Sequence, residues 1–169
     1  MENRVLMVYG SAPCGEIDRA ALETILNEFD VMAIGLDCPY EGHIHFFATY
    51  HFLDIPVYKM KRDHFKGNMD FKVIGHKHRP EIDIFEEHKE PSGSSTLLGV
   101  VAAIKLGYTK IILCGCPMEG DNKKYGSTPY NHFQKGWISR LSEIYLHTRS
   151  MSGFTKQILG HPTKEWVES

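Results

Sequence analysis

The chain has 169 residues, a length that fits one domain. Hydrophobic residues make up 42% of it and charged residues 24%, a globular balance that excludes a disordered chain. The net charge is -2 with neutral histidines, so there is no strong signal for nucleic acid or an anionic membrane. No apolar run reaches the roughly 20 residues that a membrane span needs.

The N-terminus carries no signal-peptide pattern and passes directly into an apolar segment. The four cysteines lie in or beside predicted strands, without disulfide-framework or zinc-ribbon spacing: Cys14, Cys38, Cys114 and Cys116. We therefore expect a soluble, reduced, cytoplasmic protein formed by one α/β domain over residues 1–169.

Two histidine pairs have i, i+2 spacing, His43 with His45 and His76 with His78. On a strand this spacing puts both rings on one face, which could serve a metal. No carboxylate or cysteine set matches either pair, so we predict no metal site there.

The first elements form a βαβ unit. Val5–Tyr9 is a continuous apolar run, as in a strand covered on both faces. A turn over Gly10–Gly15 follows, and an apolar stripe predicts a helix over Asp18–Phe29. Val31–Leu36 is the next predicted strand, and the crossover should be right-handed.

The middle of the chain has weaker patterns. Strands are predicted at His45–Tyr50, Val57–Met60 and Phe71–Gly75. The polar stretch Lys61–Asp70 reads as a surface loop. The charged stretch His76–Pro91 reads as an exposed excursion.

The strongest local signal is a loop of small residues ending at Thr96, which opens a helix over Ser95–Leu106 with Gly107 as its stop. Ile111–Cys114 is then a buried strand, and Asn131–His147 a helix. A short strand over Arg149–Met151 leads to a last helix that ends around residue 160. This alternation predicts a three-layer α/β/α domain with a mainly parallel sheet.

Ligands of such sheets lie outside the carboxyl ends of the strands. Three loops should meet there, Gly10–Gly15, Gly115–Tyr125 and Ser152-Gly153, and the Ser92–Thr96 loop opens a helix. Free backbone N–H groups and a helix N-terminus suit a phosphate or carboxylate. The alternative for Ser94 or Ser95 is helix capping, which needs no ligand. No G-x-G-x-x-G or P-loop motif is present, which disfavours an ordinary NAD, FAD or P-loop site.

Two segments resemble the small bacterial sialyltransferases and a related Rossmann-like group that includes archaeal pterin diphosphokinases. They are Ser92-Gly93 with its helix, and Leu106–Gly115, which reads LGYTKIILCG. Gly10–Cys14 and Asp30-Val31 match the first loop and second strand of those families. The resemblance implies a Rossmann-like fold, a nucleotide-activated donor of the CMP-sugar type and a small phage or bacterial enzyme.

The resemblance also implies roles for individual residues. The first loop and the serine–glycine loop would bind the cytidine nucleotide, Tyr125 the donor phosphate, and His161 would match the general base. The chain departs from the family at Ser11 and Gly35, where the family has asparagine, and at Pro117 and Glu119, where it has aspartate and tyrosine. Ser95 competes with Ser92 for the matching position.

Further candidates come from the residues themselves. His51 and His132 could each act as a base, or be structural histidines. Asp37 could bind a ribose hydroxyl, or only form a turn. Glu119 and Asp121 could hold Mg²⁺ on a phosphate, or form a solvated turn.

We predict a nucleotide-binding, glycosyltransferase-like enzyme. The alternatives are a Mg-dependent diphosphate or nucleotidyl transferase, and a non-catalytic module for a nucleotide or metabolite. Because so little chain remains to enclose the site, we expect a homo-oligomer. The catalytic candidates are His51, His132 and His161, and the candidate ligand-binding residues are Gly10, Ser11, Ala12, Pro13, Asp37, Ser92, Gly93, Ser94, Ser95, Gly115, Tyr125, Ser152 and Gly153.

Overall fold

The computed structural model describes residues 4–87, 92–120 and 129–169. Within these residues seven strands form one sheet in the order β5-β4-β3-β2-β1-β6-β7, and every neighbouring pair is parallel. The strands are β1 (Val5–Tyr9), β2 (Asp30–Ile34), β3 (Phe46–Ala48), β4 (Lys72–Gly75), β5 (Ile84–Phe85), β6 (Lys110–Cys114) and β7 (Thr148–Ser150). The helices are α1 (Gly15–Glu23), α2 (Asp54–His64), α3 (Ser95–Lys105), α4 (Pro129–Ser139), α5 (Leu141–Ile144), α6 (Gly153–Leu159) and α7 (Lys164–Glu168).

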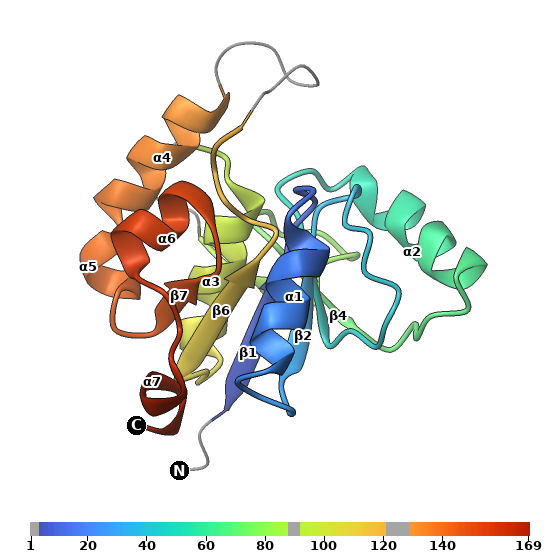
Figure 1. Cartoon of the computed structure of the whole chain (residues 1–169). Helices are drawn as coiled ribbons and strands as arrows, with labels where there is room; N and C mark the ends of the chain where they lie inside the picture. Colours follow the sequence, from blue (N-terminus) through green and yellow to red (C-terminus); the bar gives the residue numbers. More distant parts are fainter. Residues whose placement is uncertain (1–3, 88–91, 121–128) are drawn as a thin grey trace.

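Helices cover both faces of the sheet (Figure 1). Alternate residues of β1 point to opposite faces, so Leu6 and Val8 join one core and Met7 and Tyr9 the other. The first core contains α3, α4, α5 and α6, and the second contains α1, α2 and α7. The predicted Rossmann-like three-layer architecture is therefore confirmed, with a sheet that is parallel throughout the described residues.

The predicted strand at Val57–Met60 is wrong, because this segment lies inside α2. Ile55, Tyr58 and Arg62 form the buried side of that helix. Their spacing is helical, but one of the three is an arginine, so the stripe is not apolar throughout. The predicted loop from Lys61 is wrong for the same reason, since the helix continues to His64.

Several boundaries also differ. The first helix begins at Gly15 and ends at Glu23, earlier at both ends than the predicted Asp18–Phe29. The predicted helix Asn131–His147 is two helices, α4 and α5, that meet at Arg140. The exposed excursion His76–Pro91 contains the edge strand β5, followed by the buried Glu86, which pairs with Lys105 at 2.6 Å.

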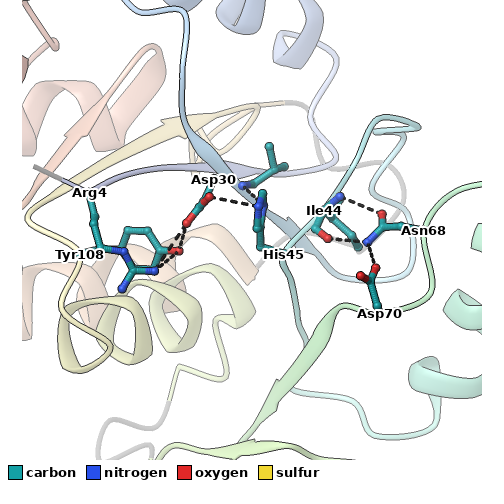
Figure 2. Close-up of polar contacts among 8 residues, drawn as sticks. Arg4, Asp30, Ile44, His45, Asn68, Asp70 and Tyr108 are labelled. Atoms are coloured by element: carbon teal, nitrogen blue, oxygen red, sulfur yellow. Dashed lines mark hydrogen bonds and ion pairs between the residues drawn. The ribbon is translucent and has the colours of Figure 1, made fainter. Parts of the chain in front are cut away.

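A polar network joins the amino ends of four strands (Figure 2). The Asp30 carboxylate, at the start of β2, accepts a hydrogen bond from the Tyr108 hydroxyl, and its second oxygen lies 3.1 Å from Nε2 of His45. The Arg4 guanidinium lies 3.6 Å from this carboxylate and donates to the Tyr108 hydroxyl at 3.0 Å. His45 Nδ1 accepts from the Val31 N–H at 3.1 Å, which leaves the ring proton on Nε2, toward Asp30.

Asn68 attaches the loop after α2 to the same side of the molecule (Figure 2). Its side chain accepts from the Ile44 N–H at 3.0 Å and donates to the Ile44 carbonyl at 2.7 Å. It also accepts from the buried Arg62 at 2.6 Å and donates to Asp70 at 2.8 Å. The buried guanidinium of α2 thereby gains a polar partner, as burial of a charge requires.

In the described part of the chain, no helix is both long and apolar enough to cross a membrane.

Candidate functional site

A cavity of about 1070 Å³ lies at the carboxyl ends of β1, β2, β3, β6 and β7. Its walls come from the loops after these strands, from the N-terminus of α3 and from Tyr130 and Phe133 of α4. This is the edge at which open parallel sheets bind ligands. Described residues of all three loops that the sequence predicted to meet there line the cavity.

The cavity brings together most of the predicted site residues. The predicted residues that line it are Gly10, Ser11, Ala12, Pro13, Asp37, His51, Gly93, Ser94, Ser95, Gly115, Ser152 and Gly153. Ser92 is buried and is not part of the lining. Tyr125 and Asp121 lie outside the described residues.

The two other candidate histidines do not line the cavity. His132 lies on the exposed side of α4. His161 is exposed just after α6, where partial burial and then the nearby Lys156 hold its pKa below the ordinary histidine value. Of the three candidate bases, the structure places only His51 at the cavity.

Close backbone approach forms the floor of the cavity. Gly10 follows β1 and its N–H donates to the Cys114 carbonyl at 2.9 Å. A Cβ at Gly10 would lie 2.4 Å from the Gly115 carbonyl oxygen, so no side chain fits there. Gly115 itself has φ +64, a conformation that favours glycine.

Asp18 in α1 binds two of the surrounding loops, those after β6 and β7, although sequence reasoning did not select it. Its side chain is only 6% exposed. Its Oδ2 accepts from the Gly115 N–H at 2.9 Å and from the Ser152 hydroxyl at 2.8 Å. These partners are 97 and 134 residues away in the sequence, so no local pattern could have revealed the contact.

Cys14 belongs to the same group of contacts. Its Sγ lies 3.3 Å from the Ser152 hydroxyl, and Cys14 is one of the residues that line the cavity. Of the four cysteines it alone is partly exposed, because Cys38, Cys114 and Cys116 are buried. Burial raises the pKa of the Cys14 thiol, so it is a protonated thiol at neutral pH and not an activated nucleophile.

The start of α3 shows which of the predicted serines are capping residues. Ser94 is the N-cap, and its hydroxyl accepts from the Leu97 N–H at 3.2 Å. The Ser95 hydroxyl accepts from the Tyr50 N–H at 2.8 Å, which attaches the loop after β3 to the helix. The capping alternative therefore holds for the Ser94 hydroxyl, while the positive end of α3 still faces the cavity.

The loop after β3 has a fixed backbone. The Thr49 hydroxyl oxygen accepts from the His51 N–H at 3.0 Å and lies 3.4 Å from Asp54 Oδ2. Thr49, His51 and Asp54 all line the cavity. The sequence predicted only His51 of these three, since Asp54 lies in the helix that was mistaken for a strand and loop.

The charges on the cavity wall are unusual for an anion site. Asp37, Asp54 and Glu119 line it, whereas none of the described lining residues is a lysine or arginine. The described residues contain no group of three or more histidine, cysteine, aspartate or glutamate side chains that could hold a metal ion. A bound phosphate would therefore depend on backbone N–H groups and the α3 N-terminus.

Comparison with solved structures identifies proteins of the same architecture. The sialyltransferase CstII from Campylobacter jejuni, in complex with the substrate analogue cytidine-5′-monophosphate, superposes with a TM-score of 0.57 at 12% identity, over 95% of this chain and 86% of that chain. The chain shares its Rossmann-like fold with CstII. Its complex with CMP-3FNeuAc gives a TM-score of 0.55 at 11% identity, over 95% and 87% of the two chains.

A variant of CstII in complex with CMP gives a TM-score of 0.55 at 14% identity, over 95% of this chain and 87% of that chain. At such identities the likeness to CstII shows the fold alone. Neither a protein-family model nor a curated protein sequence matches the chain.

Proposed function

We propose that the chain is a transferase that binds a cytidine nucleotide sugar as its activated donor in the cavity at the carboxyl edge of the sheet. The position and construction of the cavity carry this proposal. Glycine- and serine-containing loops and the N-terminus of α3 surround it at the nucleotide-binding edge of the fold. The choice of cytidine is supported by the CMP complexes of CstII, which shares the fold.

In this proposal the nucleotide lies on the backbone of the loops at Gly10 and Gly115, which pack closely against each other because neither position has a side chain. The α3 N-terminus attracts the donor phosphate. Asp37 is exposed in the loop after β2 and lines the cavity, where it accepts hydrogen bonds from ribose hydroxyls.

His51 is the proposed general base, because it is the candidate histidine that lines the cavity. Its imidazole takes the proton of the acceptor hydroxyl while the hydroxyl oxygen attacks the anomeric carbon of the donor sugar. The bond from that carbon to the phosphate oxygen breaks, and CMP leaves with the electron pair. Thr49 positions the base by holding the backbone of its loop.

One observation favours a second candidate, a Mg-dependent diphosphate or nucleotidyl transferase. Asp37, Asp54 and Glu119 lie on the cavity wall, and hard cations prefer carboxylate ligands. The three do not form a metal site together, so Mg²⁺ would also need the phosphate oxygens of the nucleotide as ligands. In that case Mg²⁺ bound together with the nucleotide would neutralise its phosphates.

Calorimetric titration of the purified protein with CMP, UMP, AMP and GMP, each with and without Mg²⁺, tests both candidates. We expect CMP to bind without Mg²⁺ and the other nucleotides to bind at least about tenfold more weakly, a difference of about 1.4 kcal/mol. Binding that requires Mg²⁺ would favour the second candidate. No heat with any nucleotide would contradict both.

Turnover separates an enzyme from a binding module. With a CMP-sugar donor and lactose or sialyllactose as acceptors, we expect CMP release that His51→Ala abolishes while its CMP affinity is kept. His132→Ala is the matched control and should remain active, because His132 lies outside the cavity lining. CMP binding without turnover would favour a non-catalytic module.

A further inference from the structure

A cationic segment follows β4, next to the cavity. Its residues are His76, Lys77, His78 and Arg79, all from the carboxyl end of a strand that pairs with β3. His51 and Asp54 of the loop after β3 line the cavity wall on that side. The segment therefore extends the same edge of the sheet beyond the proposed donor site.

An aromatic ring positions the two strong cations. The Arg79 guanidinium lies 3.6 Å from the centroid of the Phe52 ring, and the Lys77 ammonium lies 5.7 Å from it. Phe52 directly follows His51, the proposed base. Cation–π contacts of this kind hold a cation in place while leaving its N–H donors available.

Carboxylates of the described residues do not neutralise these cations. In the described part of the chain, neither Lys77 nor Arg79 has a carboxylate within 4.0 Å. Asp83 accepts from the Val73 N–H at 2.8 Å, and Glu86 pairs with Lys105 at 2.6 Å, so both point to other partners. The two charges are available to a ligand.

Stacked rings connect the segment to the cavity wall. His76 stacks on Tyr50 with centroids 3.8 Å apart and an interplanar angle of 9°. The Tyr50 ring lies beside Gly93, where a Cβ would be 3.7 Å from it, and Gly93 lines the cavity. His78 stacks on Phe85 at 3.8 Å. The cationic segment is thus held against both the cavity and the edge strand.

We propose that Lys77 and Arg79 bind an anionic group, a carboxylate or a phosphate, on the acceptor, an inference that rests on the proposed transferase function. The cavity itself presents Asp37, Asp54 and Glu119, which disfavour a second anion there. The segment after β4 offers the opposite charge on the His51 side. A planar guanidinium and an ammonium suit carboxylate or phosphate oxygens. The acceptor hydroxyl would then lie near His51.

Saturation-transfer NMR and calorimetry with saturating CMP test the proposal. Sialyllactose against lactose is the carboxylate arm, and glucose phosphate against glucose is the phosphate arm. We expect the anionic member of at least one pair to bind at least about tenfold more tightly, and added salt to weaken it. The double variant Lys77→Gln with Arg79→Gln should remove this preference and leave the affinity for CMP unchanged.

The matched control changes the exposed Lys59 and Lys72 to glutamine, which removes the same charge away from this segment and should keep the preference. Equal binding of anionic and neutral probes, or a preference that survives the double variant, would overturn the inference while CMP binding still supports the proposed function. Tighter binding of single-stranded DNA than of any sugar probe would overturn it in favour of a nucleic-acid ligand. Loss of CMP binding in the unaltered protein would contradict the proposed function, and the acceptor inference with it.

Discussion

The carboxylate of Asp18 joins the loops after β6 and β7 to α1. It is buried, and it accepts from the backbone of the loop after β6 and from the hydroxyl of the loop after β7. Cys14, in the loop after β1, contacts the same Ser152 hydroxyl. The geometry of the cavity therefore depends on one side chain that does not itself line it.

Replacing Asp18 with alanine should lower the free energy of unfolding by about 1–3 kcal/mol, because the Gly115 N–H and the Ser152 hydroxyl lose their acceptor. CMP should also bind more weakly, since the loops are no longer held together. Urea unfolding and calorimetry measure the two effects. Asp18→Asn keeps an acceptor oxygen in place and is the matched control. Equal behaviour of Asp18→Ala and the unaltered protein would contradict this role.

The reactivity of Cys14 should depend on pH in a defined direction. Burial raises the pKa of its thiol, so less thiolate is present at neutral pH than for a free cysteine. Alkylation by iodoacetamide should therefore be slower than that of a synthetic peptide of residues 11–17, and should continue to accelerate at pH values where the peptide rate has levelled off. Mass spectrometry locates the adduct. Faster alkylation of the folded protein at neutral pH would indicate an activated thiolate and refute the prediction.

At the scale of whole elements, the sequence predicted the elements whose two faces are both apolar. β1, β6 and α3 were found almost to the residue because continuous apolar runs and small-residue stops mark them. α2 was missed because its buried side includes Arg62, while Leu53 and Met60 are 70% and 74% exposed. A buried arginine and exposed apolar side chains together hide the helical period. The loops that face the cavity were predicted correctly because the strands that precede them were.

The junction of the loops after β6 and β7 depends on a glycine. Gly153 has φ +65, and a Cβ there would lie 2.3 Å from Pro117 Cβ and 2.8 Å from the Pro117 carbonyl oxygen. Gly153→Ala should cost more than the roughly 1–2 kcal/mol of left-handed strain, because the clash adds to the strain. It should also weaken CMP binding by moving one wall of the cavity.

Gly107→Ala is the matched control, since Gly107 has φ +88 and open space around its Cβ position. Gly107→Ala should lower the free energy of unfolding by the backbone strain alone and should leave CMP binding intact. Urea unfolding of both variants gives the comparison. Equal losses of stability in the two variants would mean that Pro117 moves away from the new Cβ at no cost in free energy.

Across the whole molecule, a polar network and the cavity proposed to bind the ligand lie at opposite ends of the sheet. The Arg4, Asp30, His45 and Tyr108 network joins the amino ends of the strands (Figure 2). The cavity lies at their carboxyl ends. The sequence predicted the sheet and the edge at which the cavity lies, because alternation of strands and helices determines both. It did not reveal this network, since Asp30 and Tyr108 are 78 residues apart in the chain.

Tyr108→Phe should lower the stability of the protein without changing its affinity for CMP. Burial, and then the hydrogen bond to Asp30, raise the pKa of the Tyr108 hydroxyl, so it stays a protonated donor at neutral pH. Removing it leaves a half-buried carboxylate with one donor fewer and should lower the free energy of unfolding by about 1–3 kcal/mol. The affinity for CMP should not change. A parallel loss of affinity in calorimetry would mean that the two ends are coupled.

Protection of Cys14 by CMP is the most direct test of the claim that the carboxyl-edge cavity binds a cytidine nucleotide. Cys14 lines the cavity and is the one partly exposed cysteine, so its alkylation rate reports occupancy at that place. The account predicts that saturating CMP slows alkylation of Cys14 at least about tenfold, because CMP at a concentration well above its Kd occupies nearly every site. UMP and AMP at the same concentration should have little effect. An alkylation rate unchanged by CMP, under conditions where calorimetry shows CMP bound, would place the nucleotide elsewhere and contradict the account.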